Sequence, residues 1–346
     1  MQDGNFRFPI ARLQTIYSCI FYVRMVSCRK QRASAAAWFR NYSCMQRKFK
    51  DGFISVVSNY TLCVIKTGGV FMNKYKLIAF DLDGTFLTSE KKITEENLRA
   101  VTYAAERGLE IVPATGRLYK GLPEQLRTLP FVRYCILVNG AKVYDAKEDR
   151  VISRAELSAG TALALMAHGR EIGAFYDAYI HDHGYMDREM YDRLGEVVPD
   201  SAYVNYMRTI RTPVDDLTAY IAEHTDSVQK VQYFFSDLEA RARELERMPV
   251  LFPEVKTSSS ISHNVEINAV DAGKGPALRA LCASLGFSSR EAIAFGDGLN
   301  DLDMITEAGM GVAMANGEEA VRKSADLVTC SNDEDGVAKA IYELLG

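Results

Sequence analysis

Two aspartates stand two positions apart in the segment DLDGT at residues 81–85, directly after the apolar run 76–80. As the chain leaves a strand, both carboxylates can turn toward one site, where a hard cation such as Mg²⁺ would offset their mutual repulsion. Asp81 could then attack phosphorus as a nucleophile, while Asp83 protonates the leaving oxygen and later activates water. The alternative interpretation is an ordinary Asp-Gly turn between a strand and a helix.

Two further segments carry groups suited to a phosphate. In ATGR at residues 114–117, the Thr115 hydroxyl, the Gly116 amide and a following helix start are the parts of a phosphate cradle, although an ordinary strand-to-helix turn has the same pattern. Lys274, within DAGKG at residues 271–275, supplies a point charge for a phosphoryl group. A single lysine at a helix start is, however, more often simply solvated.

The fourth segment is FGDGLND at residues 295–301. Its glycines permit a tight loop, and Asp297 and Asp301 place two carboxylates four residues apart near the next helix, a spacing that can serve a metal. Capping of that helix by Asn300 or Asp301 is the alternative. Each of the four segments stands next to a predicted core strand or the helix that precedes one, so together they indicate a single site at one sheet edge.

The elements that must position these segments begin at Lys76, where short apolar runs alternate with helical stretches. This pattern predicts an α/β fold with a Rossmann-like parallel-sheet core. Helices are predicted at 94–107, with Thr94 as the cap, and at 316–323, where Asn316 and Glu319 form a capping-box pattern. The predicted buried strands are Leu77–Phe80, Leu109–Pro113, Tyr134–Val138, Ala292–Phe295, Gly311–Met314 and Leu327–Thr329.

Residues 153–262 differ in texture, with strand-like runs at 175–180 and 228–235 and a charged helical stretch at 237–248. We predict an inserted α+β cap domain there, which leaves 72–152 and 263–346 as the catalytic core. Ligands of open α/β sheets bind at the carboxyl ends of the strands, where such an insertion could cover them. Its aromatic and histidine side chains could contact a substrate, or could simply be the two faces of a strand: Tyr176, Tyr179, His181, His183 and Tyr185.

Charge is unevenly distributed along the chain. Residues 1–71 carry 11 Lys or Arg and 2 acids, a net charge of +9, which leaves 30 against 43, or −13, for Met72 onward. The basic stretch resembles an organelle transit peptide or, alternatively, translated non-coding sequence upstream of a true start at Met72. Either origin predicts that residues 1–71 are disordered or absent from the mature protein.

Composition also restricts the partners and the compartment. The acidic main part argues against a nucleic-acid partner, since such proteins usually carry a basic footprint. No apolar run approaches the roughly 20 residues of a membrane-spanning helix, so we expect no membrane segment. The seven cysteines include no CxxC pair, which favours free thiols in a reducing compartment and a cytoplasmic protein.

The ordered set of four segments resembles the haloacid dehalogenase superfamily over essentially all of residues 72–346, and most closely its Cof-type hydrolases, whose large α/β cap follows the third core strand. The resemblance implies that Asp81 is the nucleophile and a magnesium ligand. It implies that Asp83 is the general acid/base, with its backbone carbonyl on the metal, and that Asp297 completes the metal site. The residues implied in phosphate binding are Leu82, Thr115, Gly116, Lys274 and Asn300.

Weaker candidates by the same resemblance are Asn139, in the Asn-Gly-Ala segment that leads into the cap, Arg117, and Asp301, which would support the metal without binding it directly. The implied function is a Mg²⁺-dependent phosphatase of small phosphorylated metabolites, such as sugar phosphates or phosphorylated cofactors, acting through an aspartyl-phosphate intermediate. A sugar phosphomutase of the same superfamily is the enzymatic alternative. A catalytically inactive binding protein is the other, although Asp81, Asp83 and Lys274 are all present. Neither the substrate nor the oligomeric state follows from the sequence.

Overall fold

The computed structural model of the chain describes residues 53–58, 61–66 and 74–346. It divides into two units, Met1–Phe71 and Met72–Gly346. In the first unit, strands β1 (Phe53–Ser58) and β2 (Thr61–Lys66) pair antiparallel. The predicted disorder or absence of residues 1–71 otherwise concerns residues outside the described ones, and it stays a prediction. Across the described residues, every helix is too short or too polar to cross a bilayer.

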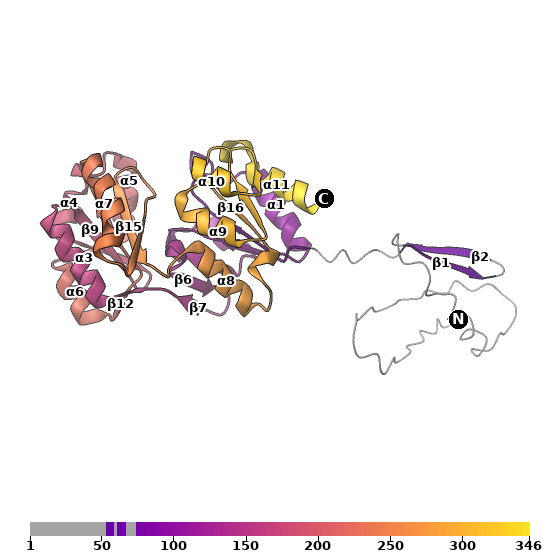
Figure 1. The fold of residues 1–346 in the computed structure, drawn as a ribbon, viewed down its shortest axis with the longest axis horizontal. Coiled ribbons are helices and arrows are strands. Elements are labelled where there is room, and N and C mark those ends of the chain that lie inside the picture. The colour runs from indigo at the N-terminus through magenta and orange to yellow at the C-terminus, as the bar shows by residue number, and fades with distance from the viewer. Residues whose placement is uncertain (1–52, 59–60, 67–73) are drawn as a thin grey trace. The chain divides into compact units, whose positions relative to one another are not determined.

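The core of the second unit is built on a five-stranded parallel sheet, as predicted (Figure 1). Its order is β18 (Leu327–Val328), β17 (Met310–Ala313), β16 (Ala292–Gly296), β3 (Leu77–Phe80) and β4 (Glu110–Pro113). The sixth predicted strand, β5 (Tyr134–Leu137), instead pairs antiparallel with β6 (Lys142–Asp145), which pairs with β7 (Arg150–Arg154). A parallel bridge between Ala114 and Ile136 joins β5 to β4. The chain reverses after β5 because Val138, Asn139 and Gly140 all have positive φ.

Helices cover both faces of the parallel sheet, because alternate residues of its strands are apolar on both sides. Ile78 and Phe80 of β3 pack toward α1 (Glu95–Glu106) and α11 (Gly336–Leu345), which lie side by side in Figure 1. Leu77 and Ala79 pack toward α8 (Lys274–Ser284) and α9 (Leu302–Glu307). The short helices α2 (Glu124–Arg127) and α10 (Glu319–Ser324) complete this layer structure.

The two predicted helix starts differ in outcome. Thr94 caps α1, since its side chain accepts a hydrogen bond from the Asn97 amide at 3.1 Å. The predicted capping box at Asn316 is wrong, because α10 begins at Glu319. Asn316 instead ties two loops together, donating to the Gly84 carbonyl at 2.8 Å and accepting from the Asn332 amide at 3.0 Å.

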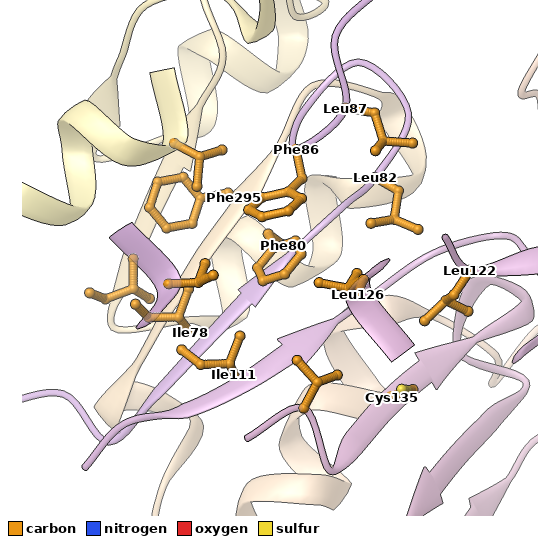
Figure 2. Close-up of a cluster of buried hydrophobic side chains, with 14 of the residues drawn as sticks. Ile78, Phe80, Leu82, Phe86, Leu87, Ile111, Leu122, Leu126, Cys135 and Phe295 are labelled. Atoms are coloured by element: carbon orange, nitrogen blue, oxygen red, sulfur yellow. The ribbon is translucent and has the colours of Figure 1, made fainter. Parts of the chain in front are cut away.

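A hydrophobic cluster anchors the segment that follows β3 (Figure 2). The rings of Phe80 and Phe86 stack with centroids 4.3 Å apart. Leu82 and Leu87 point into the same cluster, and both are fully buried. Burying a side chain of this size is worth about 1.5–3 kcal/mol. Leu82 therefore holds the turn between the two aspartates against the core.

The insertion, which we call the cap, runs from β8 (Leu157–Ser158) to β15 and contains a six-stranded sheet. The order of that sheet is β11 (Arg211–Val214), β10 (His183–Asp187), β9 (Phe175–Ile180), β13 (Lys230–Phe234), β15 (Asn264–Ala269) and β14 (Val255–Ser258). Because β15 pairs with β13 and β14, the cap sheet extends to Ala269, past the predicted boundary at 262. At its other end, Ser153 and Arg154 belong to β7, which pairs with β6 of the core.

Helices pack on one face of the cap sheet, around the apolar cluster that contains Tyr176, Ala178 and Val231. These helices are α3 (Ala159–Glu171), α6 (Leu217–His224) and α7 (Leu238–Leu251). Shorter elements, α4 (Arg188–Asp192), α5 (Ser201–Thr209) and β12 (Ser227–Val228), complete the cap. Residues of β9 and β13 on the opposite face include the buried polar side chains of Asp177, Lys230 and Gln232.

Candidate active site

The predicted site residues converge where the parallel strands end, as the alternation of strands and helices requires. Asp81 directly follows β3, Asp297 directly follows β16, and Lys274 is the first residue of α8. The Lys274 ammonium, which is fully buried, donates to Asp81 Oδ1 at 2.5 Å and to Asp301 Oδ1 at 2.6 Å. Lys274 is thus no solvated surface lysine, and it links its own segment to two of the other three predicted segments.

The loop after β16 brings Asp297 and Asp301 to the same place. Asp301 Oδ2 accepts from the amides of Asp297 and Gly298, each at 3.0 Å, so it closes the loop as well as binding Lys274. Asp297 Oδ1 accepts from the Thr85 hydroxyl at 2.7 Å. Gly84 has a φ of +88°, and a Cβ there would lie 2.3 Å from Asp297 Oδ2. Glycine is therefore required where the two loops meet.

Among the residues that the structure describes, three carboxylates share this site with one ammonium, that of Lys274. Carboxylate oxygens of Asp81, Asp297 and Asp301 all lie within 4.8 Å of one another. Burial raises the pKa of Asp81 well above its usual value, an effect that the Lys274 charge opposes and the neighbouring aspartates reinforce. Burial, together with the charge of Asp301, raises the pKa of Asp297 to about 6. Clustered oxygen donors with surplus negative charge suit a hard cation such as Mg²⁺, so the residues present fit the predicted metal.

The carboxylate of Asp83 turns to cations instead of joining this cluster. It accepts from Arg117 Nε at 2.8 Å and from Arg117 Nη2 at 2.6 Å, and the Lys91 ammonium lies 2.9 Å away. Burial acts to raise the pKa of Asp83, but the hydrogen bonds and charges of Arg117 and Lys91 lower it to about 2. Asp83 is therefore ionised in this arrangement. The atom of Asp83 that we predict to bind the metal is its backbone carbonyl oxygen. The contacts with Arg117 and Lys91 involve only the carboxylate of Asp83.

The remaining predicted residues lie on a connected set of loops. Thr115 Oγ accepts from the Arg117 amide at 3.2 Å, and the Thr115 carbonyl accepts from the Asn139 amide at 3.0 Å. Asn300 Nδ2 donates to Asn139 Oδ1 at 3.3 Å. Asn139, a weaker candidate from the sequence, thus lies between the two predicted phosphate loops. Leu82 differs, because its side chain is buried in the hydrophobic cluster of Figure 2 and leaves its backbone as the part able to meet a phosphate.

The cap aromatics divide between the two faces of their sheet. Tyr176 and Tyr185 belong to the apolar cluster on the helix side, where Tyr176 accepts from Arg170 and Tyr185 packs against Tyr220. Their packing favours the alternative interpretation, in which these two side chains simply form one face of a strand. Tyr179, on the other face, packs with the hydrophobic cluster of the core. Sequence alternation indicated two faces but did not say which one meets the core.

Three charged residues near the site were missed in the sequence: Lys91, Lys230 and Glu266. Lys91 contacts Asp83 from an exposed loop, and no sequence signal marks it. Lys230 and Glu266 are buried on the cap sheet, where Lys230 donates to the Gly116 carbonyl at 3.3 Å and Glu266 accepts from Asn139 at 2.6 Å. The sequence contains no clear signal for this pair, because each charge lies on the polar side of an alternating strand, a pattern that equally fits a solvent-exposed face.

Comparison with known proteins agrees with this geometry. The pattern of the haloacid dehalogenase-like hydrolases matches residues 78–341. The chain is 30% identical over 268 residues to the 5-amino-6-(5-phospho-D-ribitylamino)uracil phosphatase YcsE of Bacillus subtilis, covering 77% of this chain and 94% of that protein. It is 28% identical to the pyridoxal phosphate phosphatase YbhA of Escherichia coli, with 78% and 98% covered.

A solved structure of a haloacid dehalogenase-like hydrolase from Bacillus subtilis has a TM-score of 0.68 and 29% identity to this chain. The similarity covers 78% of this chain and 100% of that one. The architecture of core and cap, the four converging loops and the matched family pattern lead to one conclusion. The chain belongs to the haloacid dehalogenase-like hydrolases, the family that its motifs resemble.

Proposed function

We propose that this protein is a Mg²⁺-dependent phosphatase of small phosphorylated metabolites that uses Asp81 as its nucleophile. The observation that carries the proposal is the Asp81 carboxylate at the end of β3, with one oxygen on Lys274 and two further carboxylates within 4.8 Å. The names of two relatives describe phosphatases of a phosphorylated ribitylamino-uracil and of pyridoxal phosphate. Both compounds are small phosphate monoesters, which supports the same substrate class here.

Asp81, Asp297 and the backbone carbonyl of Asp83 are the proposed ligands of Mg²⁺, with Asp301 supporting them. Bound there, the cation would supply the positive charge that lets a dianionic phosphate approach a negatively charged nucleophile. Lys274 supplies a further positive charge from the protein itself. We assign Thr115, Gly116 and Asn300 to the phosphoryl oxygens, together with the backbone at Leu82, because their loops surround the same strand ends.

The reaction proceeds in two displacements. A free oxygen of Asp81 attacks phosphorus, the bond from phosphorus to the leaving oxygen breaks, and Asp83 gives that oxygen a proton. Asp83 then takes a proton from water, whose oxygen attacks phosphorus, so that inorganic phosphate leaves and the Asp81 carboxylate returns. Asp83 can hold a proton only after its carboxylate separates from Arg117 and Lys91, since these contacts keep it ionised. Phosphoryl oxygens of a bound substrate could compete with the Asp83 carboxylate for hydrogen bonds from Arg117 and Lys91.

The test is a panel of sugar phosphates and phosphorylated cofactors incubated with the full chain, with and without Mg²⁺, in which free phosphate is measured. We expect Mg²⁺-dependent phosphate release from at least one member, and none from Asp81→Asn protein. Positional isomerisation of a sugar monophosphate without release would identify a phosphomutase instead. Binding without either reaction would identify a non-catalytic binding protein.

A further inference from the structure

Two buried charged residues of the cap, Lys230 on β13 and Glu266 on β15, take no part in the reaction described above. Their side chains are 2% and 4% exposed, and Lys230 Nζ donates to Glu266 Oε1 at 2.9 Å. The same ammonium donates to the carbonyl of Gly116, in the core, at 3.3 Å. Removing two charges from water is energetically costly even when they pair with each other. A pair in this position, beside a proposed phosphate loop, is therefore a candidate for a role beyond stability.

The second oxygen of Glu266 begins a chain of oriented amides. Glu266 Oε2 accepts from Asn139 Nδ2 at 2.6 Å. Since an ionised carboxylate can only accept, Asn139 must turn its NH₂ group toward Glu266 and its oxygen toward Asn300. Asn300 then presents its own NH₂ group, which donates to Asn139 Oδ1 at 3.3 Å. An amide nitrogen carries two N–H groups, so one remains to be directed at a phosphoryl oxygen.

This orientation depends on Glu266 remaining ionised. Burial acts to raise the pKa of Glu266, but the Lys230 ammonium and hydrogen bonds from Lys230, Asn139 and Ser260 hold it below its usual value. A protonated carboxyl or a neutral amide at this position could donate to Asn139 and so reverse both asparagines. Lys230 therefore keeps Glu266 ionised, so that Glu266 can only accept a hydrogen bond from Asn139. Lys230 also donates to the Gly116 carbonyl.

We propose that Lys230 and Glu266 are positioning residues for phosphate: through Asn139 and Gly116 they orient the Asn300 donor and hold the Thr115-Gly116 loop in its binding geometry. This inference rests on the proposed function, and it makes phosphate affinity depend on two cap residues that do not touch the phosphate. The cap then contributes to binding of the phosphoryl group shared by all substrates, besides covering the variable part of each one.

The cap offers a matched control in the pair Asp177 and Arg211, which is also buried on its sheet. Asp177 bonds to Arg211 and Gln232, both within the cap. Asp177→Asn thus makes the same carboxylate-to-amide change as Glu266→Gln at a residue that has no direct hydrogen bond to Asn139 or Asn300.

The experiment measures binding of inorganic phosphate to the full chain by calorimetry in Mg²⁺. We expect Glu266→Gln to raise the Kd for phosphate by roughly 10- to 100-fold, because loss of one hydrogen bond to a charged group weakens binding by about this factor. Asp177→Asn is expected to leave the Kd unchanged. An unchanged Kd in Glu266→Gln protein, or an equal rise in Asp177→Asn protein, would overturn the inference.

A double variant separates positioning from stability. Replacing a buried ion pair by apolar residues often restores stability, so Lys230→Met/Glu266→Leu protein should unfold at a urea concentration close to that of the wild type. Its Kd for phosphate should nevertheless stay raised, since nothing then orients Asn139. Recovery of both quantities would mean that the pair is merely structural. On an Asn300→Ala background, Glu266→Gln should have little further effect on phosphate binding.

The readout is binding, so the two proposals can fail separately. Wild-type protein that binds phosphate but hydrolyses no monoester would contradict the phosphatase and leave the positioning role intact. Wild-type protein that hydrolyses monoesters, with Glu266→Gln protein binding phosphate equally tightly, would contradict the positioning role alone. Absence of phosphate binding to the wild type in Mg²⁺ would contradict both.

Discussion

Core and cap both bury charged side chains, but they balance them differently. In the core, carboxylates of Asp81, Asp297 and Asp301 share one ammonium, that of Lys274. In the cap, Asp177 pairs with Arg211 and Glu266 pairs with Lys230, one carboxylate to one cation. Buried carboxylates in excess of their cations are unfavourable unless a further cation binds. A carboxylate paired with one cation is already neutralised. The imbalance is what supports our proposal that a cation binds at the core site, where it would allow a phosphate to approach.

The largest expected effect comes from removing one member of the unbalanced cluster. Asp81→Asn keeps the shape of the side chain but replaces the nucleophile by an amide, so kcat should fall by roughly three orders of magnitude or more. The matched variant Asp177→Asn, which is also buried but lies in the cap, should retain most of its activity on a small aryl phosphate. Comparable losses of kcat in Asp81→Asn and Asp177→Asn protein would contradict a specific catalytic role for the core carboxylates.

Removal of the metal should have an effect nearly as large. Without a cation, the carboxylates of Asp81 and Asp297 would repel a dianionic phosphate, so excess chelator is expected to stop phosphate release and added Mg²⁺ to restore it. Ca²⁺ should substitute poorly because its larger and looser coordination misplaces the nucleophile. Full activity in chelator would contradict the assigned role of the surplus charge.

Breaking a balanced pair should affect stability instead. Arg211→Met leaves Asp177 buried without its cation, which typically costs about 3–5 kcal/mol of unfolding free energy. Urea denaturation followed by circular dichroism measures this loss. The double variant Arg211→Met/Asp177→Leu should recover much of it, because no charge then remains unpaired. If the double variant does not recover the unfolding free energy, the Asp177–Arg211 pair contributes more than mutual charge neutralisation.

The pH dependence of Mg²⁺ stabilisation should follow the raised pKa of Asp297, about 6. A carboxyl whose pKa is raised on folding binds more protons in the native state, so the metal-free protein loses stability as pH rises from about 4 to about 6. Mg²⁺ binds the ionised form and offsets this loss. We expect Mg²⁺ to raise Tm by a few degrees, roughly 5 °C, at pH 8 but not at pH 4.5.

Thermal scans at the two pH values, with Asp297→Asn as the control, test this expectation. The control protein should show a much smaller Mg²⁺ shift at pH 8. An equal shift at both pH values would mean that Mg²⁺ acts elsewhere on the protein.

The smallest expected effect concerns substrate choice. Tyr206 of α5 lies beside the Gly121 turn of the core, since a Cβ at Gly121 would be 3.4 Å from its hydroxyl. We expect this hydroxyl to donate a hydrogen bond to one of two compared metabolites. Because loss of one hydrogen bond is worth about 1 kcal/mol, Tyr206→Phe should change the ratio of their kcat/KM values about fivefold. Tyr185→Phe, on the helix side of the cap sheet, should leave the ratio unchanged. Equal effects would contradict the assignment of the two faces.

Much of the core could be predicted because its signals are local. The bounds of β3 match the predicted strand at 77–80, and Thr94 caps α1 as expected. The predicted boundary at 262 places β15 with the core, whereas β15 pairs with β13 and β14 in the six-stranded cap sheet. A strand carries its own periodicity but no mark of the sheet that it joins, and the residues of β15 pair with residues 30 to 36 positions earlier.

The candidate site divides in the same way. Asp81, Lys274, Asp297 and Asp301 were found because each follows a strand or begins a helix at the same sheet edge. Their pairing was not found, because Lys274 binds Asp81 across 193 positions. Lys230 reaches Gly116 across 114 positions, and no pattern within either segment refers to the other.

By itself, the sequence determined which chemical groups stand at the strand ends and in what order, since alternation of apolar and polar residues is a property of the local chain. Tertiary structure alone decided how those groups share protons and charge. It placed the carboxylate of Asp83 on Arg117 and directed the polar face of the cap sheet at the core. The physical reason is that partner choice depends on distance and burial in three dimensions, and these arise only once remote segments pack together.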